Sequence, residues 1–210
     1  MSQSKLVLVT GATGNQGGAC VDALLSRGHR VRALTRNSDS PAGKRLRDRG
    51  VEIAVGDFTD RDSLARAVRG VDAVYAMSTP YEQGAEKEVA QGITITDAAK
   101  AAEVAHFVYS SVASANRVTG VSHFDGKYEV EKHVQASGVP YTIVAPVFFI
   151  ENLLQPWTLP GCVRGSSLWH CLPTARCNKS PWPTLGRSLQ RSLIAVAPSS
   201  VVALTSPGMS

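Results

Sequence analysis

The sequence predicts an α/β fold in which a doubly wound parallel β-sheet carries helices on both faces. Short apolar runs rich in Val, Ile and Leu alternate with helical patterns over residues 1–150, and the connections between them are short. A glycine-rich turn follows the first apolar run. Strictly alternating strands and helices favour a parallel sheet, because each helix crosses over between two strands of the same sheet.

The strands are predicted first, from the apolar runs. Lys5–Thr10 is a near-continuous β-branched run, which is typical of a strand buried on both faces. Similar runs predict strands at 30–35, 51–55, 72–77, 106–110 and 141–145. Helical patterns separate them at about 16–27, 41–49, 60–69, 84–104 and 125–137. Gly28 is suited to close the first helix and Asp60 to cap the third.

Composition limits the class of protein. A chain of 210 residues has room for one domain with a small appendage. It has no uninterrupted apolar stretch long enough to span a membrane, and Met1–Lys5 lacks the layout of a secretory signal. The cysteines follow neither a disulfide nor a zinc spacing; they are Cys20, Cys162, Cys171 and Cys177. We therefore predict a cytoplasmic protein without a membrane segment or a metal site.

The positive charge is confined to the end of the chain. Residues 1–157 carry 17 basic and 17 acidic side chains, whereas residues 158–210 carry five basic side chains and no acidic one. These five charges form no helical stripe and are not interleaved with aromatic residues, so nucleic-acid binding is not expected.

The turn after the first strand carries the main functional signal. Gly11, Gly14 and Gly17 give the spacing Gly-x-x-Gly-x-x-Gly between a strand and a helix. In such a turn the first glycine allows the bend, the second lets the backbone approach a pyrophosphate, and the third lets the helix pack closely. The alternative is a merely structural turn. We expect a Rossmann-type dinucleotide site whose loop comprises Gly11, Ala12, Thr13, Gly14, Asn15, Gln16 and Gly17.

The end of the second strand indicates which dinucleotide binds. NAD sites favour an acidic residue there, to accept a hydrogen bond from the ribose 2′-hydroxyl. Residues 33–37 contain no carboxylate, but Arg36 could bind a 2′-phosphate, and Lys44 and Arg45 could add charge. The alternative is an exposed arginine on a solvated loop. The sequence thus favours NADP(H) over NAD.

Later strand ends extend the predicted site. Asp57 follows the third strand, where it could accept the adenine amino group, and Phe58 could line the base. Ser78 and Thr79 follow the fourth strand. Ligands of open α/β sheets bind at such carboxyl ends of parallel strands.

Several of these motifs together resemble a known family. Residues 11–17, Gly56-Asp57, the run His-Phe-Asp-Gly-Lys at 123–127 and the run Glu-Asn-Leu-Leu at 151–154 are similar to the NmrA-like group of atypical short-chain dehydrogenases/reductases. The resemblance covers about residues 4–161. It implies an NAD(P)-binding Rossmann domain, in a group that contains NADP(H)-sensing regulators and reductases of quinones and isoflavonoids.

The same resemblance assigns a lysine. Short-chain dehydrogenases use Tyr-x-x-x-Lys, in which the lysine holds the nicotinamide ribose and lowers the tyrosine pKa. Tyr128 and Lys132 have this spacing, but the family places the lysine eleven residues before Gly138, which selects Lys127. The tyrosine position is then His123, as a proton donor or a purely structural residue.

The resemblance also places two residues at the nicotinamide end. These are Phe149 and Asn152, although Phe149 could equally be plain core. Relatives commonly have arginine where this chain has Ala145, a second departure that, like His123, puts dehydrogenase turnover in doubt.

Residues 158–210 have no sustained period and do not resemble the family's small substrate domain. A shifted reading frame would join the third base of each codon to the first two bases of the next codon. The codons formed in this way can encode stretches that resemble an NmrA-like C-terminal segment. We therefore hypothesise a frameshift after Gly161. The predicted organisation is a dinucleotide-binding domain at 1–157 and an aberrant or disordered tail at 158–210.

Three functions are compatible with these features. The first is an NADP(H)-binding, redox-sensing regulator with weak or no turnover, which acts through a regulatory protein partner. The second is an NADPH-dependent reductase of a quinone-like or carbonyl substrate that uses Lys127 and His123. The third is a truncated product without activity, because a missing substrate domain would remove much of the pocket.

Overall fold

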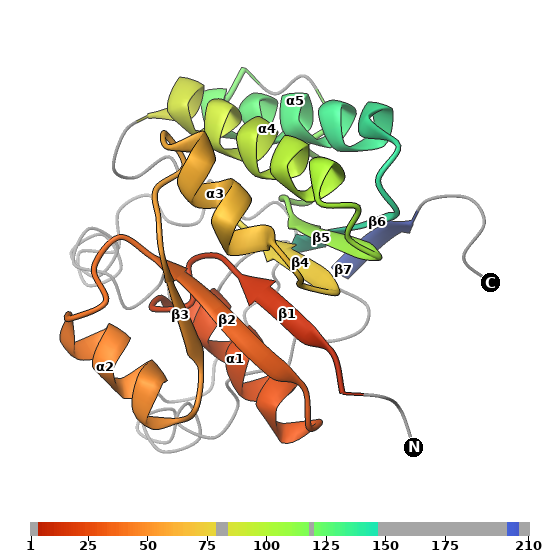
Figure 1. Ribbon diagram of the computed structural model, residues 1–210. Helices are drawn as coiled ribbons and strands as arrows, with labels where there is room; N and C mark the ends of the chain where they lie inside the picture. The colour runs from red at the N-terminus through yellow and green to blue at the C-terminus, as the bar shows by residue number, and fades with distance from the viewer. Residues whose placement is uncertain (1–3, 79–83, 118–119, 147–200, 206–210) are drawn as a thin grey trace, which may run out of the picture.

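The computed structural model describes residues 4–78, 84–117 and 120–146, and the backbone of residues 201–205. Its seven-stranded sheet has the order β3-β2-β1-β4-β5-β6-β7 (Figure 1). The strands are β1 (Leu6–Val9), β2 (Arg30–Thr35), β3 (Glu52–Val55), β4 (Ala73–Ala76), β5 (His106–Ser110), β6 (Tyr141–Pro146) and β7 (Val201–Thr205). Strands β1 to β6 pair in parallel, which confirms the predicted α/β fold.

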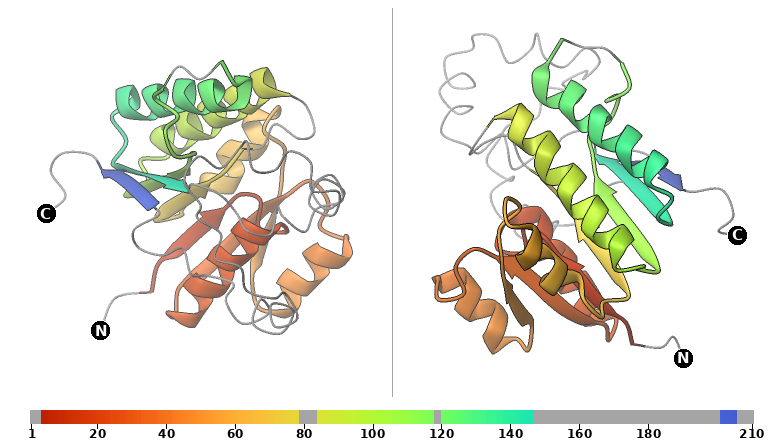
Figure 2. Two further views of the ribbon diagram at one scale, coloured as in Figure 1. Left: turned by 180° about the vertical axis from the view of Figure 1, so that it is seen from behind. Right: turned by 45° about the horizontal axis from the view of Figure 1, so that its top comes forward.

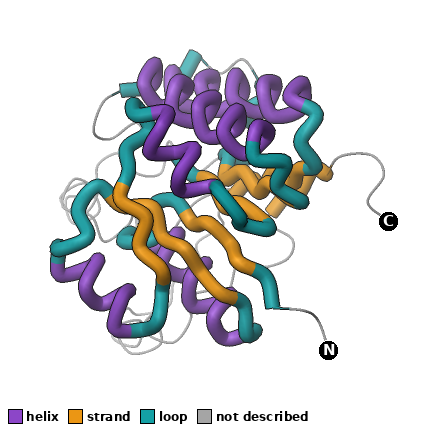
Figure 3. Tube along the Cα trace, in the orientation of Figure 1, coloured by secondary structure: helices purple, strands orange, loops and turns teal. Residues whose placement is uncertain are grey.

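The helices divide between the two faces of the sheet (Figure 2). They are α1 (Asn15–Ser26), α2 (Pro41–Asp48), α3 (Arg61–Val68), α4 (Ala85–Ala101) and α5 (Ser122–Ser137). Short loops connect many of these elements (Figure 3). Because strand side chains alternate between faces, Leu6 and Leu8 pack in the core of α3, α4 and α5, whereas Val7 and Val9 pack in that of α1 and α2.

Two helix ends form as the sequence predicts. The amide of Gly28, at a φ of +79°, donates to the Leu25 carbonyl (3.0 Å) and closes α1. The Asp60 carboxylate caps α3 and accepts hydrogen bonds from the amides of Asp62 (3.0 Å) and Ser63 (3.1 Å).

Two features of the structure differ from the sequence-based expectation. Helix α5 begins at Ser122 rather than near 125, so His123 and Lys127 lie one turn apart on one helix. No strand was expected within 158–210, but β7 pairs antiparallel with β6, with Ile143 opposite Leu204. The physical reason is that β7 is an apolar, β-branched run beside a strand edge whose backbone groups need partners.

Two kinds of feature are absent from the described residues. No helix there is long and apolar enough to cross a membrane. No group of three or more His, Cys, Asp or Glu residues in this part of the chain could hold a metal ion.

Candidate functional site

The strand order places the candidate site between β1 and β4. The sheet runs outward in one direction from β1 through β2 to β3, and in the other direction from β4 to β6. At such a switch point the loops that follow the two central strands diverge and leave a crevice at the carboxyl ends. The glycine loop lies here because it follows β1 directly.

Two glycines of this loop are required by its geometry. Gly11 has a φ of +62°, and a Cβ atom there would lie 2.7 Å from the Met77 sulfur. A Cβ atom at Gly17 would overlap the Gly11 carbonyl group and lie 2.9 Å from the Ala12 amide nitrogen. The start of α1 therefore packs directly on the loop backbone, which is the role the sequence predicts for Gly17.

The amino end of α1 is open to an anion. Its N-cap is Gly14, no side chain caps it, and its first turn contains no acidic residue. The first amides of a helix lack partners within the helix and carry the positive end of its dipole. Thr13, Gly14 and Asn15, which lead into and begin the helix, are exposed. A phosphate group is the ligand that such an end favours.

Polar side chains tie the loop to the neighbouring strands. The Thr10 hydroxyl accepts a hydrogen bond from the Met77 amide (2.8 Å) and donates to the Met77 carbonyl (3.0 Å). The side-chain amide of Gln16 donates a hydrogen bond to the Ser110 hydroxyl (2.6 Å). Gln16, predicted as a loop residue, thus directs its side chain to the end of β5.

The end of β2 lies beside the end of β3. Arg36 is exposed immediately after β2, and Asp57 follows β3. The Asp57 carboxylate accepts hydrogen bonds from the Thr59 hydroxyl (2.6 Å) and amide (2.8 Å). These hydrogen bonds and the nearby Arg36 charge lower the pKa of Asp57. Lys44 is exposed on α2.

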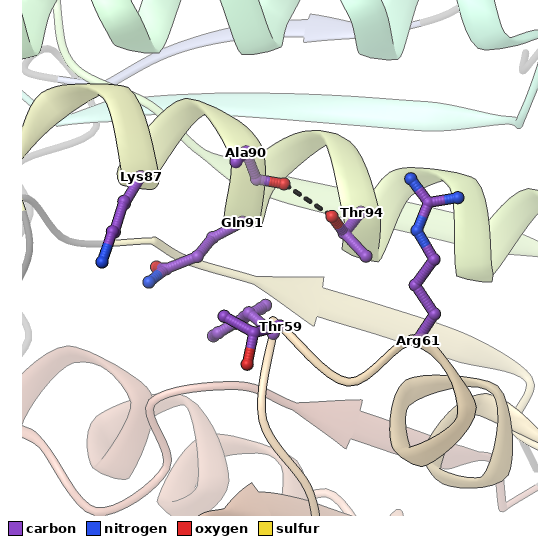
Figure 4. A pocket seen from close by; sticks show the side chains of 7 residues that line it. Thr59, Arg61, Lys87, Ala90, Gln91 and Thr94 are labelled. Carbon is purple, nitrogen blue, oxygen red and sulfur yellow. Dashed lines mark hydrogen bonds between the residues drawn. The ribbon is translucent and has the colours of Figure 1, made fainter.

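A pocket of about 210 Å³ lies between the β3–α3 loop and α4 (Figure 4). Lys87 and Gln91 extend from α4 toward the loop that carries Thr59. Phe58, a predicted adenine contact, lines this pocket. The α4 residues of this pocket were not predicted from the sequence, although Lys87, Gln91 and Thr94 have the spacing of one helix face.

Lys127 is buried at the carboxyl ends of β4 and β5. Its Nζ donates to the carbonyls of Ser78 (2.8 Å) and Ser110 (3.1 Å), and it forms an ion pair with Glu88 Oε1 (3.0 Å). The two carbonyls accept two of the three ammonium protons, and the contact with Glu88 is an ion pair. Ser78, a predicted cofactor contact, also presents its hydroxyl at 3.4 Å from this Nζ.

Burial dominates the electrostatics of this ion pair. It lowers the pKa of Lys127, and the negative charge of Glu88 opposes that shift. It raises the pKa of Glu88, and Lys127 opposes that shift in turn. Burial likewise raises the pKa of Glu131, whose carboxylate accepts a hydrogen bond from the Ser111 hydroxyl.

No phenol of the described residues replaces the tyrosine of Tyr-x-x-x-Lys. His123 is exposed in the first turn of α5, where its ring lies 4.4 Å from that of Phe124. Tyr109 lies close to Lys127, whose Nζ is 5.1 Å from the ring centroid, but Tyr109 is fully buried and burial raises its pKa.

The alternative lysine is on the surface of α5. Lys132 is exposed on α5, where it pairs with Glu129 (2.7 Å) and lies over the ring of Tyr128. Thr79, Phe149 and Asn152, also predicted site residues, lie outside the described residues, as does the predicted frameshift position.

Comparisons with known proteins agree with this architecture. The NmrA-like family model matches residues 3–167. An NAD(P)H azoreductase of Xenophilus azovorans is 35% identical over 150 residues, which are 71% of this chain and 50% of that protein. The chain spans about half the length of the curated relatives it matches.

Solved structures show the same similarity. An Escherichia coli NADPH-dependent quinone oxidoreductase complexed with NADPH is 25% identical, with a TM-score of 0.65 over 76% of this chain and 54% of that one. The negative transcriptional regulator NmrA in complex with NADP is 25% identical, with a TM-score of 0.61 over 68% of this chain and 45% of that one. NmrA is also known in complex with NAD.

Proposed function

The chain belongs to the NmrA-like family, and from this premise we propose that it binds NADP(H) at the carboxyl ends of β1 to β5 and acts as a redox-sensing regulator with weak or no turnover. In this proposal residues 1–157 form the dinucleotide-binding domain and 158–210 a tail without a site. The partner is a regulatory protein that responds to nucleotide occupancy.

One observation carries the binding proposal: the uncapped amino end of α1 is held against the glycine loop. Close packing at Gly17 fixes the direction of the helix, and Gly14 leaves room above it, since a Cβ atom there would have its nearest neighbour at 3.5 Å. Only a ligand would then conflict with a side chain at Gly14. This fits a pyrophosphate, which needs amide donors and close approach of the backbone.

The preference for NADP(H) rests on Arg36. It is exposed at the end of β2, in a stretch without a carboxylate, and a guanidinium can bind a 2′-phosphate through two hydrogen bonds. In the same arrangement Asp57 and Phe58 would receive the adenine. Titration of the protein with NADPH and with NADH, followed by cofactor fluorescence, tests this. Equal affinities, or tighter binding of NADH, would remove the role of Arg36.

Weak turnover follows from the surroundings of Lys127. A bound nicotinamide would supply the hydride, but reduction of a carbonyl also needs a proton donor at the oxygen. The buried Lys127 ammonium is held by two carbonyls and by its ion pair with Glu88, and Tyr109 is buried with a raised pKa. His123, the predicted proton donor, is exposed in the first turn of α5.

A reductase is the second candidate, and the relatives favour it. The azoreductase of Xenophilus azovorans is named as a reductase, as is the (4-alkanoyl-5-oxo-2,5-dihydrofuran-3-yl)methyl phosphate reductase of Streptomyces griseus, which is 36% identical over 151 residues. We would measure NADPH consumption with a panel of quinones, aldehydes and azo dyes, using Lys127→Ala as the control. Turnover that depends on Lys127 would favour the reductase over the regulator. Turnover unaffected by Lys127→Ala would contradict the register that selects this lysine.

A further inference from the structure

Lys127 has one negatively charged contact among its acceptors. The carbonyls of Ser78 and Ser110 are neutral, whereas Glu88 brings a carboxylate to 3.0 Å from Nζ. Glu88 comes from α4, Lys127 from α5 and the two carbonyls from the ends of β4 and β5. The ion pair thus joins the two helices that cover this face to the strand ends where the candidate site lies.

Glu88 has no other function visible in the described part of the chain. Its side chain is fully buried, and neither carboxylate oxygen receives a hydrogen bond of good geometry from the described residues. A buried carboxylate is costly unless it is paired, because it loses its hydration. Its one compensation among these residues is the charge of Lys127.

The other titratable groups that face this pair are less favourably placed to hold the ammonium. Glu131, on α5, acts on Lys127 through space and directs its carboxylate to the Ser111 hydroxyl. Tyr109, on β5, presents its ring to Nζ. His123 acts on Glu88 through space and lies on the exposed side of α5. Glu88 is therefore the group that decides where the ammonium lies.

We propose that Glu88 is a positioning residue for Lys127: it holds the ammonium at the ends of β4 and β5 and keeps it charged. This deepens the proposed function, because a charged and fixed Lys127 is what an anionic dinucleotide would meet at these strand ends. Without Glu88 the buried amine would have two neutral acceptors, and its neutral form would be favoured.

The test is the pKa of Lys127 in Glu88→Gln, which preserves the shape of the side chain and removes its charge. We would follow the Nζ and Cε resonances of lysine by NMR against pH, with the Lys127 signal assigned by its loss in Lys127→Met. We expect the pKa of Lys127 to fall by about one unit or more, a tenfold change in its protonation equilibrium.

Glu131→Gln is the matched control, since it removes a second buried carboxylate that does not form an ion pair with Lys127. It should lower the pKa of Lys127 clearly less than Glu88→Gln does. Equal shifts in the two variants, or no shift in Glu88→Gln, would overturn the proposal.

Nucleotide binding gives a second readout. In Glu88→Gln, NADPH affinity should fall as the pH rises through the lowered pKa of Lys127. The unaltered protein should still bind NADPH tightly at the same pH. If the unaltered protein binds no NADPH, the proposed function fails, whereas the NMR titration still tests the role of Glu88.

Should Glu88→Gln not fold, the double variant Glu88→Gln/Lys127→Met keeps the proposal testable. Removing both charges should restore folding relative to the single variant, because no uncompensated charge stays buried. A double variant as unstable as the single one would contradict the coupling.

Discussion

Gly17→Ala should destabilise the protein and also abolish its proposed nucleotide site. The added Cβ atom would overlap the Gly11 carbonyl and lie 2.5 Å from its carbon, so the helix or the loop must move. The oxygen and carbon of this carbonyl belong to the backbone, so neither atom can rotate away as a side chain would. Overpacking of this kind costs about 1–3 kcal/mol, which corresponds to a fall in melting temperature of roughly 2–4 °C per kcal/mol for a chain of this size.

Two neighbouring glycines give matched controls for this variant. Gly18 lies inside α1, and a Cβ atom there would lie 3.5 Å from the Ala12 carbonyl oxygen, which is an ordinary contact distance. Gly18→Ala should therefore keep or raise stability by up to about 1 kcal/mol, since alanine favours helix. Gly14→Ala should keep stability but weaken NADPH binding, because its side chain would meet only the ligand.

Unfolding by urea, followed by circular dichroism, measures the three variants beside the unaltered protein. NADPH titration of each variant measures the site. The reasoning would be refuted if Gly17→Ala and Gly18→Ala were equally stable, because the two positions differ in the space that the fold leaves for a Cβ atom. It would also be refuted if Gly14→Ala bound NADPH as well as the unaltered protein does.

Three further predictions concern single side chains. Arg36→Ala should weaken NADPH binding by about tenfold or more, because it removes a charge-assisted hydrogen bond. Titration with NADH should show nearly unchanged affinity. Asp60→Ala removes the acceptor for the Asp62 and Ser63 amides and should cost about 1 kcal/mol in urea unfolding, with Asp62→Ala as the exposed control. The pKa of Asp57 is lowered in the fold, so its contribution to stability is present above its unfolded value of 3.8 and is lost as pH falls through the folded value. Asp57→Asn should therefore flatten the acid side of the stability curve, and an unchanged curve below pH 4 would contradict the Thr59 hydrogen bonds.

Most of the fold could be predicted because it depends on local patterns. The run at β1 is buried on both faces, and its alternation divides Leu8 and Val9 between the two cores. The glycine turn and the helix caps follow from residues that lie close in sequence. The strand β7 could not be predicted, since the register that joins it to β6 depends on a contact between segments far apart in the chain.

The candidate site was predicted unevenly for the same reason. The glycine loop and Arg36 are visible in the sequence because each lies at a strand end. Lys127 was selected by resemblance, and its burial at the ends of β4 and β5 appears only when α5 is packed on the sheet. Glu88 and the pocket-lining residues of α4 gave no comparable signal, because an acidic or polar residue in a helix is usually exposed.

The amino-acid pattern alone encodes the alternating architecture, the bend that presents α1 to a phosphate and the lack of a carboxylate in residues 33–37. The packing of α4 and α5 on the sheet is what buries Lys127 beside Glu88, while Lys132 is exposed and pairs with Glu129. The physical reason is that local backbone chemistry is encoded by adjacent residues, whereas the charge state and contacts of a buried side chain depend on every element packed around it.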